Sequence, residues 1–351
     1  MINFAILGCG RIAKRHADLL GLDQITGARL VAVCDANAVR AKAFGERYGV
    51  GAYTSLAEIL QRPDIDVVSI LTPSGMHAEH AAVVAQSGRH VVVEKPMALT
   101  LDDANSMITA AASAKVRLFV VKQNRFNVPV LKMREALEQG RFGRLVLGTV
   151  RVRWCRDQAY YDQDKWRGTW ALDGGVLSNQ ASHHVDMLSW FMGDAVSVYA
   201  KGITALVKIE AEDTAAATLK FANGALGIIE ATGAARPKDI EGSISVLGST
   251  GAVEIAGFAM NSIRTWQFSE PAGSDNDVME KYSVNPPNVY GFGHQAYYEH
   301  VVHCLQTGSP AIVDGTEGKR SLELISALYE SMATGREILM PPRIKTSRLG
   351  R

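Results

Sequence analysis

Cysteine is scarce in this chain, and its placement excludes a disulfide scaffold or a cysteine metal site. Only four cysteines occur among 351 residues, and none forms a Cys-x-x-Cys pair or has metal-ligand spacing. Cys9 lies in a glycine-rich turn and Cys34 ends an apolar segment, so a disulfide framework is not expected. A reducing, cytoplasmic location fits this use of cysteine.

Net charge and long apolar runs are also missing. The formal net charge is +1 at pH 7, so no strong field favours nucleic acid or an anionic membrane as a partner. The N-terminus has no basic, apolar leader, and no segment approaches the roughly 20 apolar residues of a membrane span. The whole chain is 47% apolar and 21% charged, which is typical of a globular protein. Its 351 residues suit two domains.

A glycine-rich segment near the N-terminus has the order that binds a dinucleotide. The apolar run 4–7 is followed at once by Gly8-Cys9-Gly10-Arg11-Ile12-Ala13. Gly8 permits a tight turn, and Gly10 lets the backbone approach a pyrophosphate. The helix expected to begin here would direct its free N–H groups at the phosphates.

Asp35 indicates which dinucleotide is bound. It ends the next apolar segment, and its carboxylate can accept from both ribose hydroxyls while repelling a 2′-phosphate. Ala36 and Asn37 follow it instead of an arginine. We therefore expect NAD(H), not NADP(H), as the cofactor.

Strands and helices alternate through the first third of the chain, which is the pattern of a doubly wound parallel sheet. Further helices are expected to end at Gln86 and to follow a Thr100/Asp103 capping box, and Asp35 is expected to cap a helix over 38–48. We expect strands at 29–34, 66–71, 90–93 and 118–121. Residues 1–122 are thus predicted to form an NAD-binding Rossmann domain.

The pattern changes after Gln123. An Asn223-Gly224 pair between two alternating segments predicts a hairpin, and a helix is predicted over 174–191. Alternating segments predict strands at 146–154, 215–221, 227–232 and 243–247, and later helices near 293–305 and 317–334. We interpret 123–351 as a substrate-binding and oligomerisation α+β domain on an open, mostly antiparallel sheet. Such a sheet commonly packs its apolar face against a partner subunit, so a homo-oligomer is expected.

Lys95 is the first candidate catalytic residue. It follows an apolar strand at the carboxyl end, where parallel sheets bind ligands, and Pro96 comes next. A lysine there can bind a substrate hydroxyl and stabilise a developing alkoxide. The alternative is a surface lysine paired with Glu94.

His183 is the second candidate. On the predicted helix it shares a face with Asn179 and Asp186, whereas His184 points with the apolar residues as a core histidine would. An imidazole at this position suits a general base that takes a hydroxyl proton as hydride leaves. No metal site is expected, because the two adjacent histidines diverge and no third ligand has suitable spacing.

Together these motifs resemble the glucose–fructose oxidoreductase, inositol dehydrogenase and rhizopine catabolism (Gfo/Idh/MocA) family over nearly the whole chain. The markers are the glycine-rich turn with His16, Thr72-Pro73 with His77, Gly88 to Pro96, and Gly174-Gly175 leading to His183 and Asp186. The resemblance implies hydride transfer at a sugar or polyol carbon, with Lys95 and His183 as the catalytic pair. Many members have an aspartate where this chain has Asn179, so a simple Asp–His relay is not implied.

The resemblance also extends the cofactor site beyond the glycine-rich turn and Asp35. It implies that the Thr72-Pro73 loop approaches the nicotinamide. His16, His77 and His90 lie at the boundaries of predicted elements, and these positions also fit structural roles. The expected cofactor contacts are Gly8, Gly10, Arg11, Ile12, Asp35, Thr72, Pro73, His77, Glu94, Lys95 and Gln123.

Four segments carry a narrower resemblance: Lys122 to Asn127, Trp154-Cys155-Arg156 with Tyr160-Tyr161, Trp166 to Trp170, and Asn179 to His184. They look like dehydrogenases that oxidise the 3-hydroxyl of UDP-N-acetylglucosaminuronic acid for surface polysaccharides. In that group an asparagine is usual at the position of Asn179. The resemblance implies a homotetramer, and in some members NADH that is reoxidised by 2-oxoglutarate.

Such a substrate carries a diphosphate and a carboxylate, which require fixed positive charge. Arg156 and Arg167, beside tryptophans and tyrosines suited to stacking, are the better candidates. Arg151 and Arg153 alternate along a predicted strand and equally fit a solvated face. The expected substrate contacts are Lys95, Asn124, Arg156, Tyr161, Arg167, Asn179 and His183, although Gln123 and Asn124 equally fit local turn capping.

Two alternatives remain open at this point. One is a dehydrogenase of a free polyol or hexose, similar to inositol dehydrogenase. The other is a non-catalytic NAD(P)-binding regulator of the same fold, because a fold by itself does not assign a function.

Overall fold

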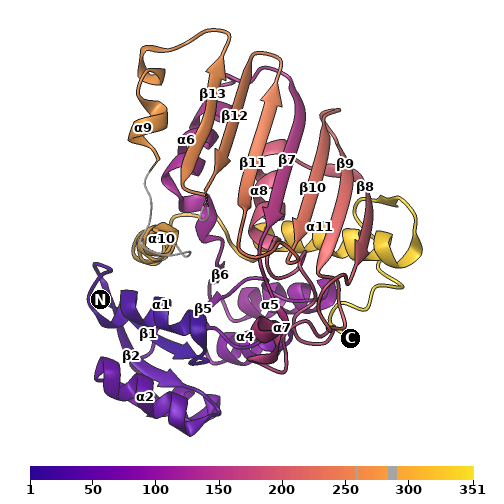
Figure 1. Ribbon diagram of the computed structural model, residues 1–351. Coiled ribbons are helices and arrows are strands. Elements are labelled where there is room, and N and C mark those ends of the chain that lie inside the picture. Colours follow the sequence, from indigo (N-terminus) through magenta and orange to yellow (C-terminus); the bar gives the residue numbers. More distant parts are fainter. Residues whose placement is uncertain (258–259, 284–290) are drawn as a thin grey trace. The chain divides into compact units, whose positions relative to one another are not determined.

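The chain forms two compact units, which are described separately (Figure 1). The computed structural model describes residues 1–257, 260–283 and 291–351. The first unit consists of Met1–Lys122 and His294–Lys319, and the second consists of Gln123–Gly293 and Arg320–Arg351.

The first unit is built on a six-stranded sheet in the order β3-β2-β1-β4-β5-β6, and all its strand pairs are parallel. The strands are β1 (Ile2–Leu7), β2 (Ala28–Cys34), β3 (Gly51–Tyr53), β4 (Val67–Ile70), β5 (His90–Val93) and β6 (Leu118–Val120). β4 is buried along its whole length, as a strand covered on both faces must be. The predicted doubly wound Rossmann sheet is confirmed, and its strand order reverses between β1 and β4, the place where such sheets bind ligands.

Helices connect these strands. They are α1 (Arg11–Gly21), α2 (Ala38–Tyr48), α3 (Leu56–Leu60), α4 (His77–Gln86) and α5 (Leu101–Ser113), with a 3-10 turn η1 (Ser74–Met76) before α4. The predicted cap of α5 is present, because the Thr100 hydroxyl accepts from the Asp103 N–H at 3.1 Å. The predicted cap of α2 was wrong. Asn37 accepts from the first N–H groups of α2, and Asp35 instead accepts from the N–H of Asn37.

A segment from late in the chain completes the first unit. Helix α10 (Gly293–Thr307) packs Tyr298 edge-on against Phe4, with ring centroids 5.6 Å apart. Farther along, the Val120 N–H donates to the Val313 carbonyl beyond the helix. The alternation of strands and helices near the N-terminus gives no sign of this packing, because it depends on long-range contacts.

The second unit contains an eight-stranded sheet in the order β13-β12-β11-β7-β10-β9-β8-β14. Its strands are β7 (Leu145–Arg153), β8 (Ala195–Ile203), β9 (Thr214–Phe221), β10 (Leu226–Thr232), β11 (Glu241–Gly248), β12 (Gly251–Ala256), β13 (Ser262–Phe268) and β14 (Ile338–Leu339). β10 and β7 are parallel, whereas the other strand pairs are antiparallel, so the prediction of an open, mostly antiparallel sheet is confirmed.

The sequence pattern of β9 and β10 explains their pairing. Residues of β9 alternate between buried and exposed, and Asn223-Gly224 makes the predicted hairpin turn to β10. Gly224 has φ 85°, and the Asn223 side chain accepts from the Ala225 N–H. Glycine suits the second position because it adopts the positive φ, and asparagine suits the first because its side chain accepts a local backbone hydrogen bond.

Helices cover one face of this sheet, as Figure 1 shows for α6 and α8. The helices of the second unit are α6 (Val128–Glu138), α7 (Gln158–Asp162), α8 (Ser182–Met192), α9 (Val278–Lys281) and most of α11 (Gly315–Thr334), with 3-10 turns η2 (Gln123–Phe126) and η3 (Gly273–Asp275). Among the residues that the structure describes, no helix is both long and apolar enough to cross a membrane.

The helix predicted over 174–191 was wrong at its start, because α8 begins only at Ser182. Gly174 has φ 81°, which is not helical. Two of the amides that follow donate to buried side chains and not to carbonyls of this segment. The Gly175 N–H donates to the Tyr329 hydroxyl, and the Leu177 N–H donates to the Glu212 carboxylate. The residues before His183 therefore form turns held by side chains from other elements.

Candidate active site

The glycine-rich turn of the first unit has the shape that the sequence predicts. Gly8 has φ 97°, and an added Cβ there would lie 2.8 Å from the Leu71 carbonyl group. Only glycine fits so close to the residues that follow β4. At Gly10, by contrast, an added Cβ would meet no atom within 4 Å, and Gly10 caps α1 without a side-chain hydrogen bond. The open space and the uncapped helix N-terminus fit a pyrophosphate.

Asp35 holds this turn from the end of β2. One carboxylate oxygen accepts from the Cys9 N–H at 2.7 Å, and the other accepts from the Asn37 N–H at 2.8 Å. Each oxygen has a second lone pair, so the carboxylate remains able to accept from ribose hydroxyls. The residues present therefore fit NAD.

Replacing Asp35 with serine should weaken NADH binding and narrow the preference for NADH over NADPH. A hydrogen bond to a charged group contributes about 1.5–3 kcal/mol, so NADH affinity should fall roughly 10- to 100-fold. NADPH affinity should change less, because repulsion of the 2′-phosphate is removed at the same time. Fluorescence titration of both cofactors measures this. Asp102→Asn, an exposed change on α5, is the control, and equal losses for both cofactors would contradict the assigned role.

His77 connects the two loops that follow β4 and β5. Its Nδ1 lies 2.9 Å from the Pro96 carbonyl oxygen, and its Nε2 lies 2.9 Å from the Thr72 carbonyl oxygen. The ring is buried, and burial lowers the pKa of His77. Both ring nitrogens thus face protein carbonyls, and the imidazole holds the Thr72-Pro73 loop and the Glu94-Lys95-Pro96 turn together.

Lys95 lies two residues beyond the end of β5 and is partly exposed. Glu94 before it is buried, and its side chain accepts from the Lys95 N–H at 2.7 Å. The first unit therefore presents a lysine at the carboxyl end of a parallel strand, beside the loop after β4.

In the second unit, His183 lies in the first turn of α8, and its side chain is mostly buried. The Gln123 side-chain nitrogen lies 2.9 Å from His183 Nε2. An amide nitrogen only donates, so His183 Nε2 accepts in this arrangement and the imidazole is neutral. Gln123 was expected near the nicotinamide or the substrate, and the structure brings it to the candidate base.

A second contact joins η2 to α8. The Arg125 guanidinium binds the Asp186 carboxylate through two nitrogens, at 2.7 and 2.8 Å, and both side chains are only 2% exposed. Asp186 was predicted beside His183, but Arg125 was not, because nothing in the local pattern around Arg125 distinguishes it from a surface arginine. The ion pair holds α8, and hence His183, against the turn that carries Gln123.

Asn179 lies outside α8, so its assignment to one helical face with His183 was wrong. Its side-chain nitrogen donates to the Asp173 carboxylate at 2.5 Å, and Asp173 also accepts from the Gly168 N–H. His184 is buried against Trp154, with ring centroids 5.7 Å apart, as expected for a core histidine.

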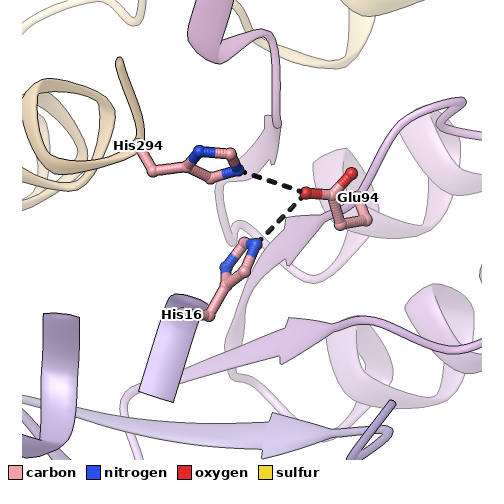
Figure 2. A group of neighbouring side chains, drawn as sticks. All are labelled: His16, Glu94 and His294. Atoms are coloured by element: carbon pink, nitrogen blue, oxygen red, sulfur yellow. Dashed lines mark hydrogen bonds and ion pairs between the residues drawn. The ribbon is translucent and has the colours of Figure 1, made fainter. Parts of the chain in front are cut away.

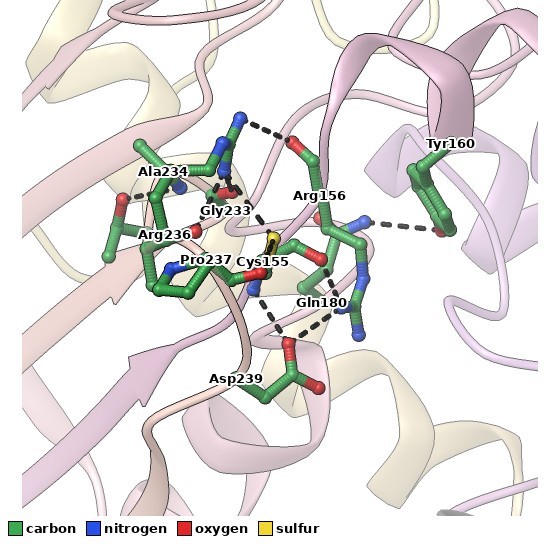
Figure 3. Close-up of polar contacts among 11 residues, drawn as sticks. Cys155, Arg156, Tyr160, Gln180, Gly233, Ala234, Arg236, Pro237 and Asp239 are labelled. Carbon is green, nitrogen blue, oxygen red and sulfur yellow. Dashed lines mark hydrogen bonds and ion pairs between the residues drawn. The ribbon is translucent and has the colours of Figure 1, made fainter.

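Two of the arginines predicted to bind substrate gather around Tyr160. Arg167 donates to the Tyr160 hydroxyl at 2.7 Å, and the Arg156 guanidinium lies 5.3 Å from the Tyr160 ring centroid. Figure 3 shows Arg156 in contact with Asp239 and close to Arg236, whose side chain donates to the Arg156 carbonyl. The sequence analysis did not single out Arg236, which adds a third positive charge to this group.

Arg151 and Arg153 lie on the sheet itself. Both form ion pairs with Glu241, and Arg153 also binds Glu230 across β7 and β10. This is the arrangement of the alternative interpretation, in which the two arginines belong to a solvated face. Asn124 lies in η2, where its carbonyl accepts from the Asn127 N–H.

Comparison with known proteins identifies the family. The profile of the GFO_IDH_MocA oxidoreductase family, NAD-binding Rossmann fold, matches residues 2–122, and that of its C-terminal alpha/beta domain matches residues 134–340. A myo-inositol 2-dehydrogenase from Thermotoga maritima is 33% identical over 236 residues, which are 65% of this chain and 68% of that protein.

Two solved structures are similar over almost the whole chain. The WlbA dehydrogenase from Bordetella pertussis, in complex with NADH and UDP-GlcNAcA, is 44% identical with a TM-score of 0.93, and the match covers 97% of this chain and 98% of that one. The WlbA dehydrogenase from Chromobacterium violaceum, in complex with the same two molecules, is 42% identical with a TM-score of 0.91, covering 97% and 96%. The chain therefore belongs to the Gfo/Idh/MocA family of NAD-dependent oxidoreductases.

Proposed function

We propose that this protein oxidises the 3-hydroxyl of UDP-N-acetylglucosaminuronic acid with NAD. The observation that carries the proposal is the 44% identity, over 97% of the chain, to a dehydrogenase solved with NADH and UDP-GlcNAcA. The chain's own residues support it, because the second unit gathers arginines around an aromatic side chain, as an anionic sugar nucleotide requires.

Bound NAD supplies the carbon that accepts hydride from C3 of the sugar. His183 takes the proton of the 3-hydroxyl as hydride leaves, so that the products are a ketone, NADH and a protonated imidazole. Lys95 donates a hydrogen bond to the same oxygen and stabilises the negative charge that develops there. Gln123 contacts the His183 ring at Nε2 and holds the ring in place.

The substrate contacts proposed in the second unit are Asn124, Arg156, Tyr161, Arg167, Asn179 and His183. The buried polar atoms in this region without a hydrogen-bond partner among the described residues include the Tyr161 hydroxyl and the Gln180 side-chain oxygen. Buried polar groups are normally paired, so an unpaired hydroxyl and an unpaired carbonyl suit a ligand rich in hydroxyl and amide groups.

The open face of the second sheet supports a homo-oligomer, dimer or tetramer. Leu226, Leu147 and Leu247 pair directly across the adjacent strands β10, β7 and β11. Leu226 is 57% exposed and Leu247 is 39% exposed. A row of exposed leucines on a sheet fits burial against a second copy of this chain. We further propose a cytoplasmic location, which suits four free cysteines, and 2-oxoglutarate as the oxidant that regenerates NAD.

An absorbance spectrum near 340 nm tests the function directly. The reduced-nicotinamide band of the purified protein, with NAD present, should grow when UDP-N-acetylglucosaminuronic acid is added. It should collapse when 2-oxoglutarate follows. No growth with this sugar, together with turnover of a free polyol such as myo-inositol, would transfer the assignment to a polyol dehydrogenase. Binding of NAD without turnover of either would favour a regulator.

A further inference from the structure

A buried cluster of ionisable side chains surrounds Glu94, the residue before Lys95 (Figure 2). His16 comes from α1 and His294 from α10, and both are fully buried in the first unit. His16 Nε2 lies 3.1 Å from one Glu94 carboxylate oxygen, and His294 Nε2 lies 3.7 Å from the same oxygen. Three segments that are far apart in the sequence therefore meet at one carboxylate.

The hydrogen bonds continue from His16 into the core. His16 Nδ1 lies 2.7 Å from the Tyr298 hydroxyl, which in turn lies 3.0 Å from the Ser69 hydroxyl on β4. The Tyr298 ring packs edge-on against the His16 ring, with centroids 5.5 Å apart. The imidazole of His16 is thus held at both nitrogens and on one face of its ring.

These contacts also set the charge of Glu94. Burial opposes ionisation, but the hydrogen bond with His16 and the proximity of His294 hold the pKa of Glu94 well below its usual value. Burial lowers the pKa of His294. Glu94 is therefore a carboxylate at neutral pH, and both of its oxygens are hydrogen-bond acceptors.

The second carboxylate oxygen of Glu94 accepts from the backbone N–H of Lys95 at 2.7 Å. Toward β4, the last hydrogen bond of the parallel sheet is the one that the Glu94 N–H donates to the Ile70 carbonyl. From there the Glu94 side chain takes over the pairing of the Lys95 amide. The backbone at Lys95 is therefore held on one side by this carboxylate and on the other by the contact of His77 with the Pro96 carbonyl.

We propose that His16, His294 and Tyr298 are positioning residues, which hold the Glu94 carboxylate so that Glu94 fixes the backbone from which Lys95 projects. The inference rests on the proposed role of Lys95 in the dehydrogenase reaction. Displacement of a reacting group by about 1 Å can cost about 100-fold in rate, so the positioning groups should affect turnover without touching the substrate. It also gives α10 a role in the reaction, although α10 follows all strands of the second sheet except β14 in the sequence.

Kinetics of two conservative variants test the proposal. Glu94→Gln keeps the size of the side chain and removes its charge, and Tyr298→Phe removes only a hydroxyl. We expect kcat to fall at least about tenfold in Glu94→Gln and severalfold in Tyr298→Phe, while the sugar-nucleotide KM and the NADH Kd stay within about threefold. Glu79→Gln, the same change at an exposed position on α4, should leave all three unchanged. Parental kcat in both variants would overturn the proposal, as would a loss of NADH affinity equal to the loss of turnover.

Hydrogen exchange at the Lys95 amide gives a readout that needs no substrate. Overlapping peptides isolate this amide, because Pro96 has none. Exchange should be slow in the parent and at least about tenfold faster in the variants Glu94→Ala and Tyr298→Phe. Glu94→Ala removes the carboxylate that accepts from this amide, and Tyr298→Phe removes the hydroxyl that holds His16 beside that carboxylate. Unchanged exchange would overturn the positioning role. A protected Lys95 amide in a parent that does not oxidise the sugar nucleotide would instead overturn only the proposed function.

A bound cation is the competing outcome. His16, Glu94 and His294 each offer a ligand atom, and these atoms lie within 4.8 Å of one another. Elemental analysis of the purified protein after equilibration with zinc decides between the two roles. We expect no stoichiometric zinc. One zinc per chain that is lost in His294→Asn would replace the positioning role with a metal site.

Discussion

Replacing Lys95 with methionine is expected to lower kcat about 1,000-fold while NADH affinity changes by less than about threefold. Methionine keeps most of the length and volume of lysine but cannot donate a hydrogen bond or stabilise negative charge. Loss of a single preorganised donor at a developing oxyanion costs about 100- to 1,000-fold, and a donor that carries full charge belongs at the upper end. Formation of NADH in the steady state and calorimetric titration of NADH into the variant measure the two quantities.

Lys42→Met is the matched control for this change. Lys42 lies on α2 of the same unit, its side chain is 76% exposed, and its ion pair with Glu46 is a solvated one. It should behave as the parent. If Lys95→Met retained more than about a tenth of the parental kcat, Lys95 would be no more than a binding residue.

A loss of similar size is expected when His183 is replaced with glutamine. Glutamine can still face Gln123 but cannot take a proton from the substrate. General-base catalysis contributes about 100- to 10,000-fold, so kcat should fall within that range. The loss should be measured as a pH profile, because an imidazole acts as a base only when it is neutral. In the parent, kcat/KM should fall as the pH is lowered and the base becomes protonated, and that decrease should be absent in the variant.

His303→Gln provides the control, since His303 is exposed on α10 and takes no part in the proposed reaction. Its kcat and its pH profile should match those of the parent. A His183→Gln variant that kept the low-pH decrease would show that another group is the base.

Local patterns predicted most of the fold. The Gly8 turn, the strand that ends at Asp35 and the Asn223-Gly224 hairpin each depend on the conformations of a few neighbouring residues, and all three are present. The start of α8 was missed for the opposite reason. Residues 174–181 have helical periodicity, but Gly174 has a positive φ, and the Gly175 and Leu177 amides donate to the side chains of Tyr329 and Glu212 from distant segments.

The same distinction applies to the candidate site. Lys95 and Gln123 were predicted as site residues because each follows a parallel strand and because the family resemblance includes both positions. Arg125 and His294 were not assigned roles, since their partners Asp186 and Glu94 lie far away in the sequence. Strand alternation separated Arg156 and Arg167 from Arg151 and Arg153, and the two strand arginines pair with glutamates on the sheet.

The chain passes from one unit to the other three times, after Lys122, after Gly293 and after Lys319. A fragment cut at Lys122 would keep all six parallel strands but lose Tyr298, the packing partner of Phe4 and the hydrogen-bond partner of His16 and Ser69. A nucleotide-binding unit made from residues 1–122 alone would therefore lack part of its own core and the buried partner of two polar side chains.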